Sequence, residues 1–260
     1  MLLGERYQIQ TPIVRFRNGS SIVYRGRDAH MNREVAIKMV RDIYTDNQLI
    51  VRRFEEAASA VLAMPGAHPH VVQVYDYGHA GATPYLIMEF VDATNLRLYQ
   101  RSVLILPMQQ AISIAHAVAL GLHALHSHGM VHKGIQPEHL LLGQDGIVKI
   151  TPFSVTWGAS GHYYAPEQLQ NEGMTPASDI YSLGSVIYEM LTGHRPFEGD
   201  NPAAVAMRHF HEAPVPPGQL NPGITPPLEK IILRCLEKAP AMRYQDGMQL
   251  AHALETLREA

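Results

Sequence analysis

The chain has 260 residues, of which 46% are hydrophobic and 17% are charged, which is enough apolar material for one large domain or two lobes. A formal net charge of -3 excludes the strongly basic surface that attracts nucleic acids or acidic membranes. The single cysteine, Cys235, excludes an internal disulfide and indicates a reducing compartment. Neither a bilayer-spanning apolar run nor a signal peptide is apparent, so we expect a cytoplasmic chain or the cytoplasmic domain of a longer membrane protein.

The first ninety residues have the pattern of β-strands with one helix among them. Phe54, Ala58 and Val61 recur at helical spacing and predict a helix over Leu49 to Met64, which Pro65-Gly66 ends. The predicted strands of this part are Tyr7 to Val14, Ser21 to Gly26, Glu34 to Val40, Val71 to Tyr77 and Tyr85 to Phe90.

After Val91 the pattern becomes mainly helical. One hairpin interrupts it, in which Leu140 to Leu142 and Ile147 to Ile150 flank the turn Gly143-Gln144-Asp145-Gly146. The predicted helices are Met108 to His126, Asp179 to Thr192, Pro202 to His211, Leu228 to Glu237 and Gln249 to Arg258. A β-rich part followed by an α-rich part predicts an α+β fold in two lobes.

Histidine is unusually frequent, with fifteen residues in the chain. Five of them gather in one stretch: His123, His126, His128, His132 and His139. Imidazole groups can bind zinc, but no cysteine accompanies these residues and no HExxH pattern occurs. We therefore interpret them as helix-surface and turn histidines and expect no metal site.

A series of short motifs occurs in a recognisable order. They are Val35-Ala36-Ile37-Lys38, His128-Gly129-Met130-Val131-His132, Tyr164-Ala165-Pro166-Glu167, Ser178-Asp179-Ile180-Tyr181-Ser182-Leu183-Gly184 and Lys238-Ala239-Pro240-Ala241-Met242-Arg243-Tyr244. From Glu5 to about Leu257 the chain resembles a bacterial Ser/Thr protein kinase of the eukaryote-like type. The resemblance implies one bilobal protein-kinase-like domain over residues 1–260, with a β-rich N-lobe over about 1–90 and a hinge and α-helical C-lobe over about 91–260.

The resemblance also implies scaffold features. The N-lobe would hold a five-stranded antiparallel sheet and one main helix. His132 and Phe153 would be buried, and Asp179 would accept hydrogen bonds from the backbone of the catalytic loop. Glu167 and Arg243 would form a buried ion pair.

A nucleotide-binding site follows from the same resemblance. Lys38 would hold the α- and β-phosphates of ATP. Glu56 is the preferred partner of Lys38 on the N-lobe helix, and Glu55 is the alternative. The residues expected around adenine are Val23, Ala36, Met88, Leu141 and the backbone of Glu89 and Val91.

The positions that carry the chemistry depart from the family pattern. Gly134 stands where the catalytic Asp is expected, and Gln136 stands where a lysine is expected. His139 and Pro152 occupy the two positions of the Mg²⁺ ligands. The segment aligned with the Gly-rich loop, Phe16 to Ser21, keeps only Gly19, and the activation segment of 16 residues, Pro152 to Glu167, is short.

These departures predict a catalytically inactive kinase homologue, a pseudokinase that regulates or scaffolds a protein partner such as an active kinase or another signalling protein. It would take no cofactor, or would bind ATP weakly without Mg²⁺. The alternative is a divergent ATP-dependent transferase or an atypical Ser/Thr kinase that uses Lys38. This segment itself is expected to contact neither nucleic acid nor membrane.

Overall fold

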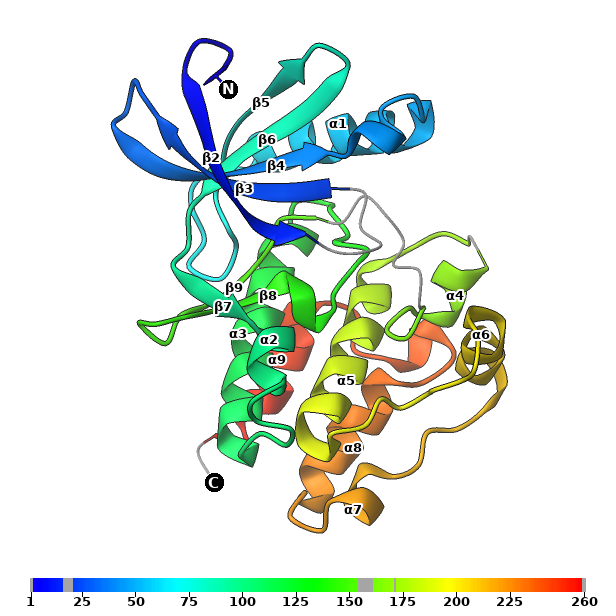
Figure 1. The fold of residues 1–260 in the computed structure, drawn as a ribbon. Helices are drawn as coiled ribbons and strands as arrows, with labels where there is room; N and C mark the ends of the chain where they lie inside the picture. Colours follow the sequence, from blue (N-terminus) through cyan, green and yellow to red (C-terminus); the bar gives the residue numbers. More distant parts are fainter. Residues whose placement is uncertain (1, 16–20, 154–160, 171, 259–260) are drawn as a thin grey trace. The chain divides into compact units, whose positions relative to one another are not determined.

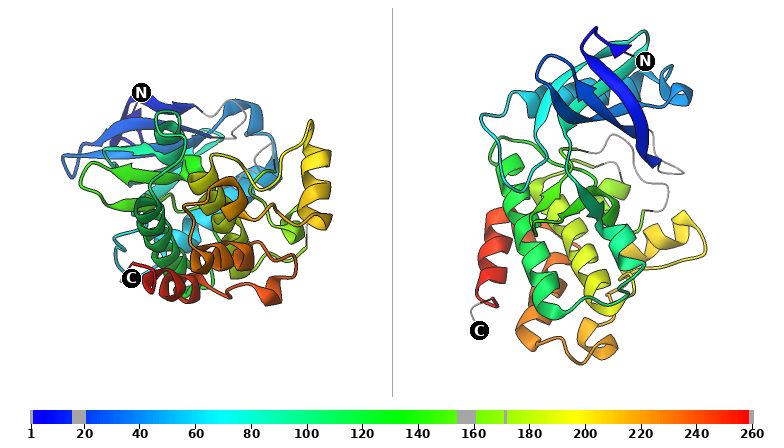
Figure 2. Two further views of the ribbon diagram at one scale, coloured as in Figure 1. Left: turned by 90° about the horizontal axis from the view of Figure 1, so that it is seen from below. Right: turned by 60° about the vertical axis from the view of Figure 1, so that its left-hand side comes forward.

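The structure is a computed structural model that describes residues 2–15, 21–153, 161–170 and 172–258 (Figure 1). The described chain forms two compact units. The first holds residues 2–15, 21–68, 72–92 and 152–153, and the second holds 69–71, 93–151, 161–170 and 172–258. The first unit is rich in strands and the second in helices, which confirms the α+β class (Figure 2). The treatment of residues 1–260 as one kinase-like domain stays a prediction.

The first unit is built on an antiparallel sheet whose described strands run in the order β1-β2-β3-β4-β6-β5. The strands are β1 (Leu2–Leu3), β2 (Tyr7–Arg15), β3 (Ser21–Asp28), β4 (Arg33–Val40), β5 (Val74–Ala80) and β6 (Thr83–Glu89). The expected number of five strands is therefore wrong, because β1 adds a sixth at the edge. Two residues carry too short a pattern for the sequence to reveal such a strand.

Strand β2 has an irregular register. Leu2 and Leu3 of β1 pair with Gln8 and Tyr7, so β1 covers only the beginning of the outer edge of β2. The pairing of β2 with β3 shifts between Ile9 and Pro12 and again between Pro12 and Val14. Pro12 has no backbone N–H to donate, which explains why regular pairing fails at this position.

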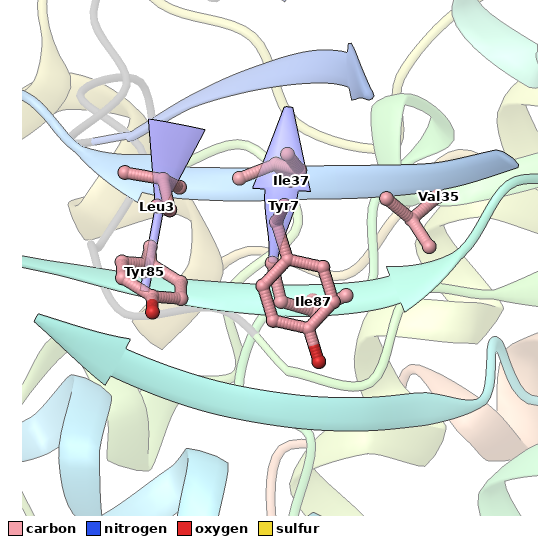
Figure 3. Packing of buried hydrophobic residues seen from close by; sticks show 6 residues of the cluster. All are labelled: Leu3, Tyr7, Val35, Ile37, Tyr85 and Ile87. Atoms are coloured by element: carbon pink, nitrogen blue, oxygen red, sulfur yellow. The ribbon is translucent and has the colours of Figure 1, made fainter. Parts of the chain in front are cut away.

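One face of the sheet carries a buried apolar cluster (Figure 3). Its members are Leu3, Tyr7, Val35, Ile37, Tyr85 and Ile87. Successive side chains of a strand point to opposite faces, so a cluster that includes Val35 and Ile37 leaves Ala36 and Lys38 of β4 on the other face. The packing of this cluster thereby fixes the direction in which Lys38 points.

A single long helix, α1 (Gln48–Leu62), accompanies the sheet, after the short 3₁₀ turn η1 (Asp42–Tyr44). The Asn47 side chain accepts hydrogen bonds from the backbone N–H groups of Leu49 and Ile50 and so caps the helix. Its buried residues are Phe54, Ala58 and Val61, the face that helical spacing predicts. The helix was expected over Leu49 to Met64.

Strand β5 lies later in the chain than the apolar pattern predicts. The expected strand began at Val71, whereas β5 begins at Val74. Val71 belongs instead to the second unit, within which it forms an isolated parallel bridge with Ile150. The apolar pattern does not indicate which residues of the run pair with β6 and which pair with another strand.

The second unit combines a small sheet with packed helices. Its strands are β7 (Ala93–Asn95), β8 (Leu140–Gly143) and β9 (Val148–Ile150), in the order β7-β8-β9. The expected hairpin at Gly143 to Gly146 is confirmed. The helices are α2 (Leu96–Gln100), α3 (Met108–His126), α4 (Pro166–Leu169), α5 (Pro176–Thr192), α6 (Pro202–His211), α7 (Pro217–Leu220), α8 (Pro226–Cys235) and α9 (Gly247–Glu255), with the 3₁₀ turns η2 (Pro137–His139) and η3 (Pro240–Met242).

Helix α5 forms the core of the second unit and begins earlier than expected. Pro176 occupies its first turn, and the Ser178 hydroxyl accepts from the backbone N–H of Thr175, so the helix begins before the apolar run at Asp179. Gly193 ends it in the left-handed conformation at φ 74°, as predicted. None of the helices in the described part of the chain is both long and apolar enough to span a membrane.

The expected ion pair between Glu167 and Arg243 is confirmed and buried. Arg243 Nη1 lies 2.7 Å from Glu167 Oε1, and Arg243 Nη2 lies 3.0 Å from Glu167 Oε2. The Ser178 hydroxyl donates to the same carboxylate at 2.7 Å. Burial raises the pKa of Glu167, but the hydrogen bonds from Arg243 and Ser178 outweigh it, so its pKa is lowered overall.

His209 of α6 is fully buried. Its Nδ1 lies 2.8 Å from the Tyr181 hydroxyl, and its ring lies 4.7 Å from that of Phe197. Burial lowers the pKa of His209 to about 3, and the nearby charges of Lys238 and His162 add to the effect. Between about pH 3 and 6.5 the His209 imidazole is therefore neutral in the native state, whereas the same imidazole is protonated in the unfolded chain.

We predict that Glu167→Ala lowers the free energy of unfolding by about 3 to 5 kcal/mol, because it leaves the Arg243 guanidinium buried without its counter-charge. Chemical denaturation of the two proteins measures the difference. Glu198→Ala, at an exposed position, is the matched control and should change stability by less than about 0.5 kcal/mol. Equal losses in the two variants would contradict a special role for the pair.

We predict that the protein loses stability as the pH falls from about 6.5 toward 3, because the unfolded state then binds a proton at His209 that the native state excludes. The contribution approaches about 1.4 kcal/mol per pH unit within that window. Denaturation curves at several pH values should show a shallower dependence for His209→Phe. His211→Phe, an exposed neighbour, should keep the wild-type slope, and a common slope for all three proteins would rule the prediction out.

Candidate active site

The candidate residues of the first unit share one face of its sheet. The register places Val23 opposite Lys38, and Ala36 opposite Met88. Residues directly opposite one another point to the same face, as do residues two apart on one strand. Val23, Ala36, Lys38 and Met88 therefore form one surface, opposite the apolar cluster of Figure 3.

Lys38 is buried, with 7% of its surface exposed. Its Nζ donates to the backbone carbonyl of Phe153 at 3.0 Å and lies 4.8 Å from the centre of the Phe153 ring. The Phe153 ring in turn meets Phe54 of α1 edge-on at 5.7 Å. Burial lowers the pKa of Lys38 to about 8, so the amine is mostly protonated at neutral pH. Phe153 is itself buried, as expected.

The structure places the two candidate glutamates of α1 with other partners. Glu56 accepts from Arg52 Nε at 2.7 Å on an exposed part of the helix. Glu55 lies 2.8 Å from His79 Nε2. A contact of Lys38 with either carboxylate is not found among the described residues. Arg52 and Glu56 are four residues apart on one helix face. This spacing is a sequence signal that Glu56 pairs with Arg52 and not with Lys38.

The remaining positions of the predicted nucleotide site lie where β6 ends and in the second unit. The backbone N–H of Glu89 donates to the carbonyl of Gln73 at 2.8 Å, so it is already engaged. Val91 follows β6 in irregular chain and is partly buried. Leu141 lies on β8 in the second unit.

Asp179 of α5 binds the backbone of the loop from His132 to His139, as expected. Asp179 is fully buried. Its Oδ2 accepts the backbone N–H of His132 at 2.7 Å, and its Oδ1 accepts that of Lys133 at 2.9 Å. His126 Nε2 adds a third hydrogen bond to the same carboxylate at 3.0 Å. Lys133 is held in the left-handed region at φ 64°, which non-glycine residues rarely adopt.

His132 is buried, as expected, and both of its ring nitrogens are engaged. The backbone N–H of Gly134 points at Nδ1 from 3.2 Å, so Nδ1 accepts. Nε2 therefore carries the proton and donates to the carbonyl of Thr151 at 2.7 Å. The interpretation of the clustered histidines as surface and turn residues is wrong for His126, whose side chain is buried against Asp179. The burial of His132 agrees with the family resemblance.

His139 is oriented by the same loop. Its Nδ1 lies 2.6 Å from the carbonyl oxygen of Gly134, and a carbonyl only accepts, so Nδ1 carries the proton. Nε2 of the neutral ring is then an acceptor, and the Gln136 side-chain amide lies 3.4 Å from it. The loop therefore fixes which nitrogen of His139 can take up a proton.

The donor set at these positions does not match Mg²⁺, which prefers carboxylate and water oxygens. The positions at which the resemblance places its ligands hold an imidazole, His139, and an apolar ring, Pro152. Within residues 2–15, 21–153, 161–170 and 172–258, no three His, Cys, Asp or Glu side chains gather as a metal site would require. Phe16 to Ser20 of the expected Gly-rich loop and most of the activation segment lie outside the described residues.

One feature of the site has no sequence signal. Arg97 of α2 donates from Nε to Glu138 Oε1 at 2.9 Å and from Nη1 to Glu189 Oε1 at 2.9 Å. The Tyr163 hydroxyl donates to Glu189 at 2.6 Å. These residues are 26 to 92 positions apart, so no local pattern joins them. Together they hold Glu138, the residue before His139.

Comparison with known proteins places these observations in a family. A model of the protein kinase domain matches residues 18–255. A probable serine/threonine-protein kinase of Clostridium perfringens is 34% identical over 271 residues, covering 99% of this chain and 39% of that protein. Serine/threonine-protein kinase PknB of Mycobacterium leprae is 36% identical over 267 residues, covering 95% and 42%.

A solved structure agrees in fold. The PknI kinase domain of Mycobacterium tuberculosis has a TM-score of 0.81 at 20% identity, with 98% of this chain and 99% of that chain covered. The expected protein-kinase-like fold is confirmed. The chain spans about two fifths of the length of the curated relatives it matches.

The relatives overturn the prediction of a catalytically inactive regulatory or scaffolding module. Proteins that match nearly the whole chain at 34–36% identity are named serine/threonine-protein kinases. The prediction rested on the departures at Gly134, Gln136, His139 and Pro152, on a Gly-rich segment that keeps only Gly19, and on a short activation segment. The imidazole of His139 can itself transfer protons, so its presence at that position does not exclude catalysis.

We predict that Lys38→Met raises the free energy of unfolding at pH 7 by about 1 to 2 kcal/mol. Methionine fills similar space without a buried charge, and this gain exceeds the loss of one hydrogen bond to Phe153. The pKa of Lys38 is lowered, so the penalty is greatest below about pH 8, and the difference should shrink as pH rises toward 10.5. Chemical denaturation at pH 7 and 10 tests this, with exposed Lys230→Met as control. A less stable Lys38→Met protein would contradict the prediction.

Proposed function

Because the chain belongs to the protein kinase family, we propose that it is an atypical Ser/Thr protein kinase domain, which transfers the γ-phosphoryl group of ATP to a protein hydroxyl. The observation that carries the proposal is the fixed orientation of His139, whose Nδ1 is committed to the Gly134 carbonyl. Nε2 is therefore the ring nitrogen that can take up a proton, in the loop where the family places its catalytic group.

The first unit supplies the groups for the nucleotide. Val23, Ala36 and Met88 offer an apolar surface on which an adenine ring can lie, and Lys38 extends from the same face. With a pKa of about 8, the Lys38 ammonium is charged at neutral pH and can offset phosphate charge. Its present hydrogen bond to the Phe153 carbonyl would be exchanged for bonds to phosphate oxygens.

The second unit supplies the groups for transfer. The substrate hydroxyl oxygen attacks the γ-phosphorus of ATP. The bond between the γ-phosphorus and the oxygen that bridges the β- and γ-phosphates breaks, and ADP leaves. The hydroxyl proton passes to His139 Nε2, and the Gly134 carbonyl supports the resulting imidazolium through Nδ1. Asp179 binds the backbone N–H of Lys133, the residue before Gly134, and Arg97 binds the side chain of Glu138, the residue before His139.

The partner in this proposal is a protein substrate, in keeping with the signalling partner expected from the sequence. A cytoplasmic location fits the need for ATP and the free thiol of Cys235, which is buried and has a pKa raised to about 12 by burial. The curated relatives are more than twice as long as this chain, so the activity and partners of the whole protein belong to the same proposal.

We predict phosphate transfer from radiolabelled ATP to serine or threonine of a mixed peptide library, followed by mass spectrometry of the modified sites. His139→Asn should keep a hydrogen bond to the Gly134 carbonyl but remove the base, and should lower kcat about 100-fold. Lys38→Met should abolish transfer and weaken ATP binding. The acid limb of the pH–rate profile should disappear in His139→Asn.

The matched control is His128→Asn, which alters an exposed histidine of the same region. It should keep wild-type kcat. Absence of transfer by the folded wild-type protein with Mg²⁺, Mn²⁺ and no metal would contradict the proposed activity. Equal rates for His139→Asn and wild type would remove His139 from the mechanism while leaving the activity in place.

A further inference from the structure

The second unit contains a cavity of about 760 Å³ that the proposed reaction does not use. Its walls come from the sheet β7-β8-β9, from helix α3 and from the turn after α9. A volume of this size is typical of sites that take a drug-sized molecule. Neither the loop from His132 to His139 nor Leu141 contributes to its lining.

The sheet wall is one row of facing side chains. Thr94 of β7 pairs with Leu142 of β8, which pairs with Val148 of β9, and all three line the cavity. The neighbouring row, which includes Leu141, therefore points to the opposite face of the sheet. Thus the cavity and the predicted adenine residue Leu141 lie on opposite faces of strand β8.

The helix wall is one stripe of α3. Gln110, Ser113, Ile114 and Ala117 recur at intervals of three and four residues, so they lie on one side of the helix. Ile114 and Ala117 are buried and apolar, whereas Ser113 is exposed at the rim. With Leu142 and Val148 opposite, the interior presents apolar surface between two rigid elements.

The charge on the cavity wall has one sign. None of the described residues that line the cavity has a carboxylate side chain, and Arg258 supplies a positive charge at the rim. Arg258 Nη1 lies 3.2 Å from His116 Nδ1. Burial and the charge of Arg258 lower the pKa of His116, so this ring is neutral at pH 7 and accepts from the guanidinium. His70, His252 and Glu255 are the other titratable groups that act on His116.

We propose that this cavity binds a small amphipathic anion, an acyl or aryl carboxylate or sulfonate. The apolar body lies between Leu142 and Ile114, and the anionic group pairs with the Arg258 guanidinium, with Ser113 as a further donor at the rim. A neutral or cationic molecule of the same shape gains the apolar contacts but not the ion pair. The proposal stands independently of phosphoryl transfer.

Decanoate is the test ligand, with decanol as its uncharged counterpart, and isothermal titration measures both dissociation constants. Wild type should bind decanoate about tenfold more tightly than decanol, because only the anion gains a charge-assisted bond. Arg258→Gln should erase that preference by weakening decanoate binding alone. Exposed Arg101→Gln is the matched control and should bind like wild type.

A second variant tests the location. Ser113→Trp places a large ring over the rim from an exposed helix position that tolerates it, and should weaken both ligands at least tenfold while circular dichroism stays unchanged. Hydrogen exchange with decanoate should slow at the amides of β8 and β9. The proposal is overturned by equal affinities for decanoate and decanol, by unchanged binding in either Arg258→Gln or Ser113→Trp, or by no binding at millimolar decanoate.

Discussion

The ion pair between Arg243 and Glu167 is the contact on which the second unit depends. All five N–H donors of the Arg243 guanidinium are used: two bond the Glu167 carboxylate, and the others bond the carbonyls of Ala177, Glu237 and Lys238. One side chain thus joins the start of α4, the start of α5 and the segment after α8. A lysine offers one point charge and cannot reproduce this arrangement.

Arg243 is connected through α5 to the loop from His132 to His139. The Ala177 carbonyl that bonds Arg243 lies two residues before Asp179, which in turn holds the backbone of His132 and Lys133. The carbonyl of the next residue, Gly134, sets the ring of His139. Hydrogen bonds buried in this way are strong because the local dielectric is low, and a buried polar group left without a partner is costly. The orientation of the His139 ring therefore depends, through these contacts, on the ion pair between Arg243 and Glu167.

The sequence predicts the scaffold better than the site, and particular residues show why. Helical spacing predicts α3 and α6 with their observed ends, because periodicity and caps are local properties. The two-residue strand β1 and the bridge from Val71 to Ile150 depend on distant partners, which no local pattern encodes. Glu56 stands at the position expected for a partner of Lys38, but it pairs with Arg52, one helical turn earlier. The prediction of function failed for a related reason: a motif records which residue is usual at a position, whereas the tautomer of His139 follows only from its contacts.

The irregular strand β2 has a consequence for the behaviour of the protein in concentrated solution. Beyond the two residues paired with β1, the described part of β2 has an outer edge without a strand partner. A straight open edge would serve as a template for a strand of another molecule and so for fibril growth. Pro12 makes that template irregular, because the register of β2 breaks on both sides of it. The irregular backbone at Pro12 is therefore a poorer template for a strand of another molecule than a straight edge would be.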